Sequence, residues 1–190
     1  MHQEVVTVVS GLPRSGTSMM MKMLEAGGMP VLIDHIRTPD EDNPKGYYEF
    51  ERVKQIEHDQ AWLKDAKGKV VKMVAALLKH LPPGYQYKVV FMRRKMEEIL
   101  ASQRRMLARN NKPTDEIGDA KMAALFRRHL QIIEAWLQEQ PNIDVLYISY
   151  NETVQDPHTQ AERLNQFLGD ILDIRQMVNV VDPNLYRQQQ

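Results

Sequence analysis

The chain has 190 residues, 43% of them hydrophobic, and its 25 Lys and Arg residues balance its 25 Asp and Glu residues. This charge balance gives no general reason to expect a nucleic-acid or membrane partner, and the lack of cysteine excludes disulfides and thiolate metal sites. No apolar run approaches the ~20 residues of a membrane-spanning helix. We therefore expect one cytoplasmic domain over residues 1–190; the sequence does not indicate its oligomeric state.

Apolar β-branched runs alternate with amphipathic segments along the chain. Strands are expected at residues 5–10, 31–33, 69–73, 88–92 and 144–149. Helices are expected at residues 17–26, about 51–63, 75–80, 95–109, about 114–140 and 162–168. This alternation predicts an α/β fold, a three-layer α/β/α arrangement with a central parallel sheet. Ligands of such sheets bind beyond the carboxyl ends of the strands, so the polar strand ends at 10–14, 93–94 and 150 should meet in one crevice.

A glycine-containing loop at residues 11–18, reading GLPRSGTS, joins the first strand to the first helix. This geometry presents backbone N–H groups and a helix N-terminus to an anion. The sequence is close to the Walker A pattern, with Gly11 and Gly16 in register and Ser18 at the hydroxyl position. Thr17 replaces the Walker lysine, and the cation, Arg14, lies three residues earlier. The loop therefore predicts a P-loop-like phosphate site, but not one that binds Mg-ATP in the usual way.

A second candidate anion site follows the strand at 88–92. The guanidinium of Arg94 is planar, permanently charged and suited to phosphate, and Ser102 lies eight residues further on. Arg93, Arg94 and Lys95 could equally begin a solvent-exposed basic helix, but positive charge at a helix start opposes the helix dipole and favours a bound anion. Tyr150, at the end of the last strand, is on composition alone more simply explained as covering the core.

Together these motifs resemble the sulfotransferases that use 3′-phosphoadenosine-5′-phosphosulfate (PAPS). Residues 11–18 resemble the 5′-phosphosulfate loop of that family, in which Arg or Lys precedes Ser-Gly-Thr. Residues 89–103 resemble the 3′-phosphate motif, an Arg at a strand end with a Ser eight residues later. Residues 146–169 are similar to the family's strand, Tyr-Glu-Asp turn and Phe-Leu-Gly helix, and residues 43–49 to a segment of some bacterial members.

The resemblance implies a PAPS-dependent sulfotransferase. Such an enzyme moves a sulfuryl group to a hydroxyl or amine of a small-molecule or carbohydrate acceptor, in line and without a metal, and leaves 3′-phosphoadenosine 5′-phosphate (PAP). The implied site residues are Arg14 at the bridging and leaving oxygens, Ser15, Gly16, Thr17 and Ser18 around the 5′-phosphate, Arg94 and Ser102 on the 3′-phosphate, and Tyr150 near the adenine. Because a sulfuryl group carries less negative charge than a terminal phosphate, arginine and backbone donors can take the role of Mg²⁺.

The motifs do not fix the general base that an acceptor hydroxyl needs. Small-molecule members of the family carry a His just after the strand that corresponds to residues 69–73, where this chain has Val74, and other branches use a Glu after the first helix. The candidates are Glu49, His35 and Glu51. We rank Glu49 first, because it follows two tyrosines at an expected helix start. Lys72 is a candidate partner of the sulfuryl oxygens, and Arg187 a candidate to complete the 3′-phosphate site.

Two other functions remain open at this point. One is a P-loop kinase, which would need Mg²⁺ and a Walker lysine that this loop lacks. The other is a non-catalytic module that binds PAP or another nucleotide without turnover. The loop, Arg94 and Ser102 argue against such a module, but the unassigned base leaves it open.

Overall fold

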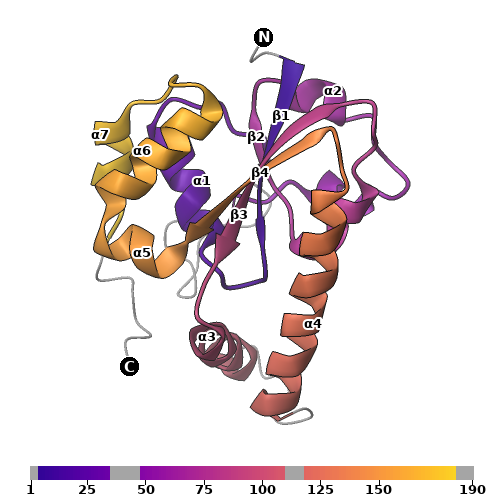
Figure 1. Ribbon diagram of the computed structural model, residues 1–190, viewed down its shortest axis with the longest axis vertical. Helices are drawn as coiled ribbons and strands as arrows, with labels where there is room; N and C mark the ends of the chain where they lie inside the picture. The colour runs from indigo at the N-terminus through magenta and orange to yellow at the C-terminus, as the bar shows by residue number, and fades with distance from the viewer. Residues whose placement is uncertain (1–3, 35–47, 110–117, 183–190) are drawn as a thin grey trace.

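Four parallel strands form the centre of the structure (Figure 1). The computed structural model describes residues 4–34, 48–109 and 118–182. The strands are β1 (Val5–Gly11), β2 (Val70–Lys72), β3 (Gln86–Arg93) and β4 (Ile143–Ser149). They lie in the order β2-β1-β3-β4 and all pair in parallel. The order brings the end of β1, which leads into the glycine loop, beside the end of β3, which leads into Arg94.

Helices cover both faces of this sheet, because its central strands bury side chains on each face. Val6 and Val8 of β1 enter one core, and Val9 enters the other. The first core is covered by α2 (Leu63–Ala66), the 3₁₀-helix η3 (Ala75–His80) and α4 (Asp119–Gln138). The second is covered by α1 (Thr17–Ala26), α6 (Pro157–Leu168) and α7 (Ile174–Asn179). The expected α/β/α arrangement with a central parallel sheet is confirmed.

The helix α3 (Met96–Arg109) follows β3 beyond the carboxyl edge of the sheet, beside the first turns of α4 (Figure 1). An ion pair between Arg104 and Asp119 joins the two helices. α3 and α4 therefore enclose the edge of the sheet at which the expected phosphate sites lie.

Most expected elements match the structure, and two do not. The expected strand at 31–33 is wrong: Val31 makes only an isolated bridge to Val70, since β2 is three residues long and offers little edge to pair with. The expected helix at 51–63 is also wrong, because it consists of the 3₁₀-helix η2 (Glu51–Gln55) and a separate turn into α2. The Asp59 side chain accepts a hydrogen bond from Ala61 N at 3.1 Å. Such a local bond competes with the backbone hydrogen bonds of an α-helix.

The C-terminal helices show capping signals that the sequence prediction did not use. The helix expected at 162–168 begins at Pro157, because Asp156 caps it by accepting a hydrogen bond from Thr159 N at 3.1 Å. Asp173 caps the unexpected α7 in the same way. A further unexpected helix, α5 (Tyr150–Gln155), begins directly after β4. Across the residues that the structure describes, no helix combines the length and apolarity that crossing a membrane requires.

Candidate active site

The three polar strand ends lie side by side, as the parallel topology predicts. In the register of the sheet, Gly11 of β1 is opposite Met92 of β3, and Arg93 of β3 is opposite Ser149 of β4. The glycine loop, Arg94 and Tyr150 therefore leave the sheet from three adjacent strands. The expectation that these three strand ends lie together at one edge of the sheet is confirmed.

The backbone of the glycine loop has an unusual conformation that its glycines permit. Gly11 has φ 148°, and a Cβ added there would lie 2.7 Å from the carbonyl oxygen of Met92. Gly16 has φ 99°, and a Cβ added there would lie 2.4 Å from the ring of Tyr150. Arg14 is also left-handed, with φ 71°. Left-handed residues between ordinary ones turn successive backbone N–H groups toward one point, which favours anion binding.

The loop ends at the N-terminus of α1, where Gly16 occupies the N-cap position. Glycine has no side chain with which to cap the first turn, and the first turn contains no acidic residue. The first N–H groups of an α-helix have no partner within the helix, and the helix dipole adds partial positive charge. This end of α1 is therefore suited to bind a phosphate group.

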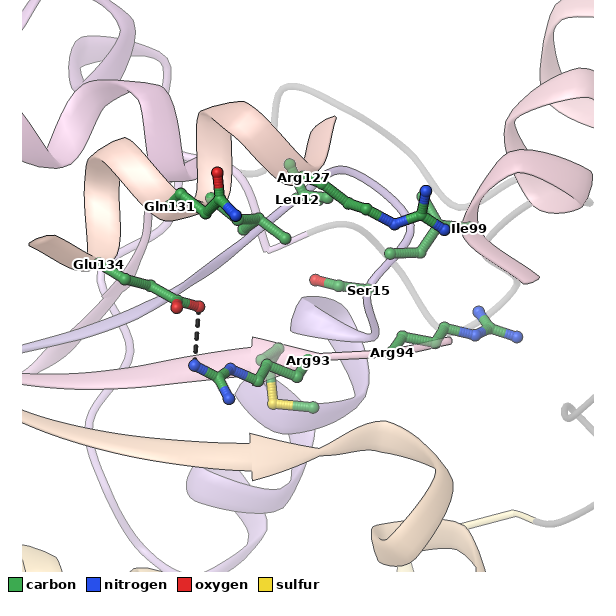
Figure 2. Close-up of a pocket in the computed structure, with 10 residues that line it drawn as sticks. Leu12, Ser15, Arg93, Arg94, Ile99, Arg127, Gln131 and Glu134 are labelled. Carbon is green, nitrogen blue, oxygen red and sulfur yellow. Dashed lines mark hydrogen bonds and ion pairs between the residues drawn. The ribbon is translucent and has the colours of Figure 1, made fainter. Parts of the chain in front are cut away.

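Ser15 places a buried hydroxyl between the loop and the adjacent cavity. Its side chain points into the cavity (Figure 2), and the residue is only 1% exposed. Its Oγ has no hydrogen-bond partner among the described residues. Leaving a buried hydroxyl without a partner costs about 1–3 kcal/mol, so such a group in a native site calls for an explanation such as a ligand that completes it.

Two hydrogen bonds join the glycine loop to the Arg–Ser motif. Arg14 Nε donates to Ser102 Oγ at 2.8 Å, and an Nη of Arg94 donates to the backbone oxygen of Arg14 at 3.1 Å. The structure thus brings Arg14, Arg94 and Ser102 together, as the sequence motifs imply.

Arg94 is held in place by buried partners. Its Nε donates to a carboxylate oxygen of Glu98 at 2.8 Å, and the two side chains are 8% and 6% exposed. Asn151 donates from Nδ2 to the other oxygen of Glu98 at 2.8 Å, and its own Oδ1 accepts from Lys95 N at 3.3 Å. The opposite charges of Arg94 and Glu98 largely cancel, and Asn151 anchors this pair to α5.

The Tyr150 ring contacts both Arg94 and the glycine loop. The Arg94 guanidinium is 4.2 Å from the centre of its ring, within the range of a cation–π interaction, and Gly16 packs against the edge of that ring. Burial raises the pKa of the Tyr150 hydroxyl, and the nearby Arg94 offsets part of that rise. Tyr150 is a member of the second core, so it positions Arg94 and the loop. Its placement near an adenine remains a prediction.

A cavity of about 320 Å³ opens between the loop, the end of β3, α3 and α4 (Figure 2). Its apolar lining consists of Leu12, Met92, Ile99 and Leu130. Its polar lining consists of Ser15, Arg93, Arg94, Arg127, Gln131 and Glu134. Arg93 donates to Glu134 at 2.7 Å and stacks on Tyr147, 4.1 Å from the ring centre. A lining that combines apolar side chains with mostly cationic charged ones suits a ligand with an anionic group.

Glu49, the first-ranked base, lies on the other side of β1, near the end of β2. Its two carboxylate oxygens are each 3.9 Å from a lysine, Lys72 at one and Lys54 at the other. Lys72 is the last residue of β2 and is largely buried. The structure therefore brings together the first-ranked base and the lysine that the sequence placed at a strand end. Glu51 is more exposed and pairs with Lys54 at 2.6 Å.

Some candidates lie outside the described residues, and some site residues were missed. His35, Arg187 and residues 43–47 lie outside the described ranges. Glu98 could have been found from its position four residues after Arg94, the spacing at which helical side chains meet. Asn151 and Arg127 carry no such signal, because they reach the site through the packing of β4, α5 and α4.

A family model described as the sulfotransferase family matches residues 45–172, more than half of the chain. The chain belongs to the sulfotransferase family. The matched range contains Arg94, Ser102 and Tyr150 but begins after the glycine loop. The assignment of residues 11–18 therefore rests on their sequence and geometry. No curated protein shows a significant match.

Two solved sulfotransferase domains share the fold of this family member. The domain from the olefin synthase of Synechococcus PCC 7002 is 15% identical, with a TM-score of 0.55, over 98% of this chain and 83% of that one. The domain from the curacin biosynthetic pathway is 14% identical, with a TM-score of 0.55, over 96% of this chain and 79% of that one. At such identities the similarity establishes a common fold and carries no further conclusion on substrates.

Proposed function

We propose that this sulfotransferase uses PAPS as donor and transfers its sulfuryl group to a hydroxyl or amine of a small-molecule or carbohydrate acceptor. The observation that carries the proposal is the direct contact between the two phosphate motifs, from Arg14 to Ser102 and from Arg94 to the backbone of Arg14. A ligand that spans this contact would need two anionic groups a short distance apart. The 5′-phosphosulfate and the 3′-phosphate of PAPS meet that requirement.

The residues present fit such a donor. The left-handed backbone at Arg14 and Gly16, the uncapped start of α1 and the unpartnered Ser15 hydroxyl form a cradle that suits the 5′-phosphate. We assign Ser15, Gly16, Thr17 and Ser18 to that phosphate, Arg94 and Ser102 to the 3′-phosphate, and Tyr150 to the base. PAPS, when bound, supplies the activated sulfuryl group.

We also assign to Arg14 and Lys72 the stabilisation of charge on the transferring group. Arg14 lies in the loop, and we assign its guanidinium to the bridging and leaving oxygens. Lys72 lies at the end of β2 on the opposite side of β1, and we assign its ammonium to the sulfuryl oxygens. Sulfuryl transfer, like phosphoryl transfer, depends mainly on alignment and charge stabilisation, so fixed cations of this kind can supply most of the catalysis.

Glu49 is our candidate for the general base. It lies within 3.9 Å of Lys72, so an acceptor hydroxyl beside the sulfuryl oxygens would also lie beside a carboxylate. Glu49 would take the hydroxyl proton as the acceptor oxygen bonds to sulfur and the bond from sulfur to the bridging oxygen of PAPS breaks, so that PAP leaves. The acceptor would then approach from the β2 side of the loop, and the adenosine would extend over β3. We propose that the whole chain forms one domain with this function.

The test is PAP release from PAPS in the presence of a panel of phenols, alcohols, amines and carbohydrates. Glu49→Gln should lower turnover by about 10²–10⁴-fold, the usual contribution of a general base. Glu51→Gln is the matched control, because Glu51 is a nearby carboxylate that pairs with the same Lys54. Equal losses in both variants, or a loss in Glu51→Gln alone, would overturn the assignment of Glu49. Tight PAP binding without turnover on any acceptor would favour the non-catalytic module.

A further inference from the structure

The helix α4 forms one wall of the cavity beside the phosphate motifs. Arg127, Leu130, Gln131 and Glu134 face the cavity from α4, at the three- and four-residue spacing of one helix face. Figure 2 shows the Arg127 side chain extending from α4 toward Ile99 of α3. No sequence motif of the site lies on α4, so its contribution is separate from the motifs already assigned.

The charges that line the cavity are not evenly balanced. Arg93 is paired with Glu134 at 2.7 Å, and Arg94 with Glu98 at 2.8 Å. Arg127 makes no hydrogen bond or ion pair with any other residue that the structure describes. It is also solvent-exposed, so it needs no partner to remain charged. Among the described arginines of the cavity, Arg127 therefore holds the charge that no carboxylate compensates.

The 3′-phosphate site, as proposed, has too little positive charge. A phosphate monoester carries about −1.5 to −2 charge at neutral pH. Arg94 offers one guanidinium, but Glu98 neutralises it within the same buried pair. Ser102 offers a hydroxyl without charge. Arg14 also contacts Ser102, at 2.8 Å, but its guanidinium is assigned to the bridging and leaving oxygens. A further cation for the 3′-phosphate itself would therefore stabilise the bound dianion.

Arg127 has the position to supply that cation. Ile99, which the Arg127 side chain approaches, lies three residues before Ser102, and both residues face the loop side of α3. Arg94 lines the same cavity and extends in the same direction from the opposite wall (Figure 2). We propose that Arg127 of α4 binds the 3′-phosphate of PAPS and PAP together with Arg94 and Ser102. This inference rests on the proposed function, because it names a further residue of the same donor site.

The test compares two ligands that differ only in the 3′-phosphate, PAP and adenosine 5′-monophosphate (AMP). Their dissociation constants are measured by calorimetric titration on the full chain and on the variants Arg127→Ala, Arg127→Lys and Arg128→Ala. Arg128 is the matched control, because it is the next residue of α4, is also exposed and is absent from the cavity lining. Thermal unfolding without ligand confirms that each variant folds.

We expect Arg127→Ala to weaken PAP binding about tenfold, which corresponds to about 1.4 kcal/mol, and to leave AMP binding unchanged. Arg127→Lys should recover most of the loss, and Arg128→Ala should bind both ligands as the unaltered chain does. Unchanged PAP binding in Arg127→Ala, or equal losses for PAP and AMP, would overturn the assignment of Arg127 and leave the proposed donor in place. If the unaltered chain binds PAP no better than AMP, the 3′-phosphate site itself is wrong, and the proposed function fails with it.

Discussion

Arg14 and Ser102 are 88 residues apart in the chain, yet Arg14 Nε donates a hydrogen bond to Ser102 Oγ at 2.8 Å. The contact joins the loop after β1 to the helix after β3. It therefore couples the residue assigned to the bridging and leaving oxygens with a residue assigned to the 3′-phosphate.

Ser102→Ala removes the acceptor of this bond. Ser102 is buried, so we expect the free energy of unfolding to fall by about 1 kcal/mol, the usual net value of one hydrogen bond. We also expect PAP to bind about tenfold more weakly while AMP binding stays the same, because only PAP carries the 3′-phosphate. Urea unfolding and calorimetric titration measure the two effects. If Ser102→Ala loses stability but still prefers PAP over AMP, the assignment of Ser102 to the 3′-phosphate is wrong.

Gly16→Ala should disrupt the loop. The added methyl group would lie 2.4 Å from the Tyr150 ring, and φ at this position is 99°. We expect a loss of about 1–3 kcal/mol in unfolding free energy and loss of PAP binding.

Gly28→Ala separates the cost of the left-handed backbone from the cost of the contact with Tyr150. Gly28 has φ 98°, but an added Cβ would meet nothing within 4 Å. This control therefore carries the backbone cost without the steric contact. Similar stability losses in the two variants would show that the contact with Tyr150 does not constrain the loop.

Glu98→Gln breaks the buried pair with Arg94. The change leaves a buried guanidinium without its carboxylate, and removing one partner of a buried ion pair typically costs about 3–5 kcal/mol. Glu97→Gln is the control, because Glu97 is the exposed neighbour in the same first turn of α3. Chemical denaturation of both variants measures the difference. Equal stability in the two would mean that Glu98 does not hold Arg94.

The stability of the fold should fall in alkaline solution. Burial raises the pKa of Tyr150 above its ordinary value near 10, so the neutral hydroxyl is favoured in the folded chain. Its stabilising contribution is complete below pH ~10 and is lost as the pH rises from there through the folded pKa. Tyr150→Phe should therefore show a smaller decline in unfolding free energy between pH ~9 and ~11. An identical decline in both proteins would contradict this role of Tyr150.

The sequence was most informative where the site is built from short, fixed spacings. The loop at 11–18 and the eight residues from Arg94 to Ser102 each lie within one strand–turn–helix unit, so local geometry places them at the carboxyl edge of a parallel sheet. Lys72 could be placed near the site for the same reason, since it ends a strand. These units were enough to predict the family and the α/β/α fold.

The sequence was least informative where a residue reaches the site through packing. Arg127 lies on α4, whose position depends on the core residues Ile133 and Leu137 and not on any motif. Asn151 reaches Glu98 only because β4 lies beside β3. The expected helix at 51–63 is interrupted by a turn, in which the Asp59 side chain accepts a hydrogen bond from Ala61 N, and such a local contact is not visible in the hydrophobic pattern.

The most direct test of the donor assignment is a calorimetric titration of the full chain with PAP and, separately, with ATP and Mg²⁺. We predict that PAP binds at least about a hundredfold more tightly than ATP-Mg²⁺, and that PAP at a hundred times its Kd raises the free energy of unfolding by about 2.7 kcal/mol. Tight binding of ATP-Mg²⁺ without binding of PAP would contradict the account and favour a nucleotide-dependent kinase.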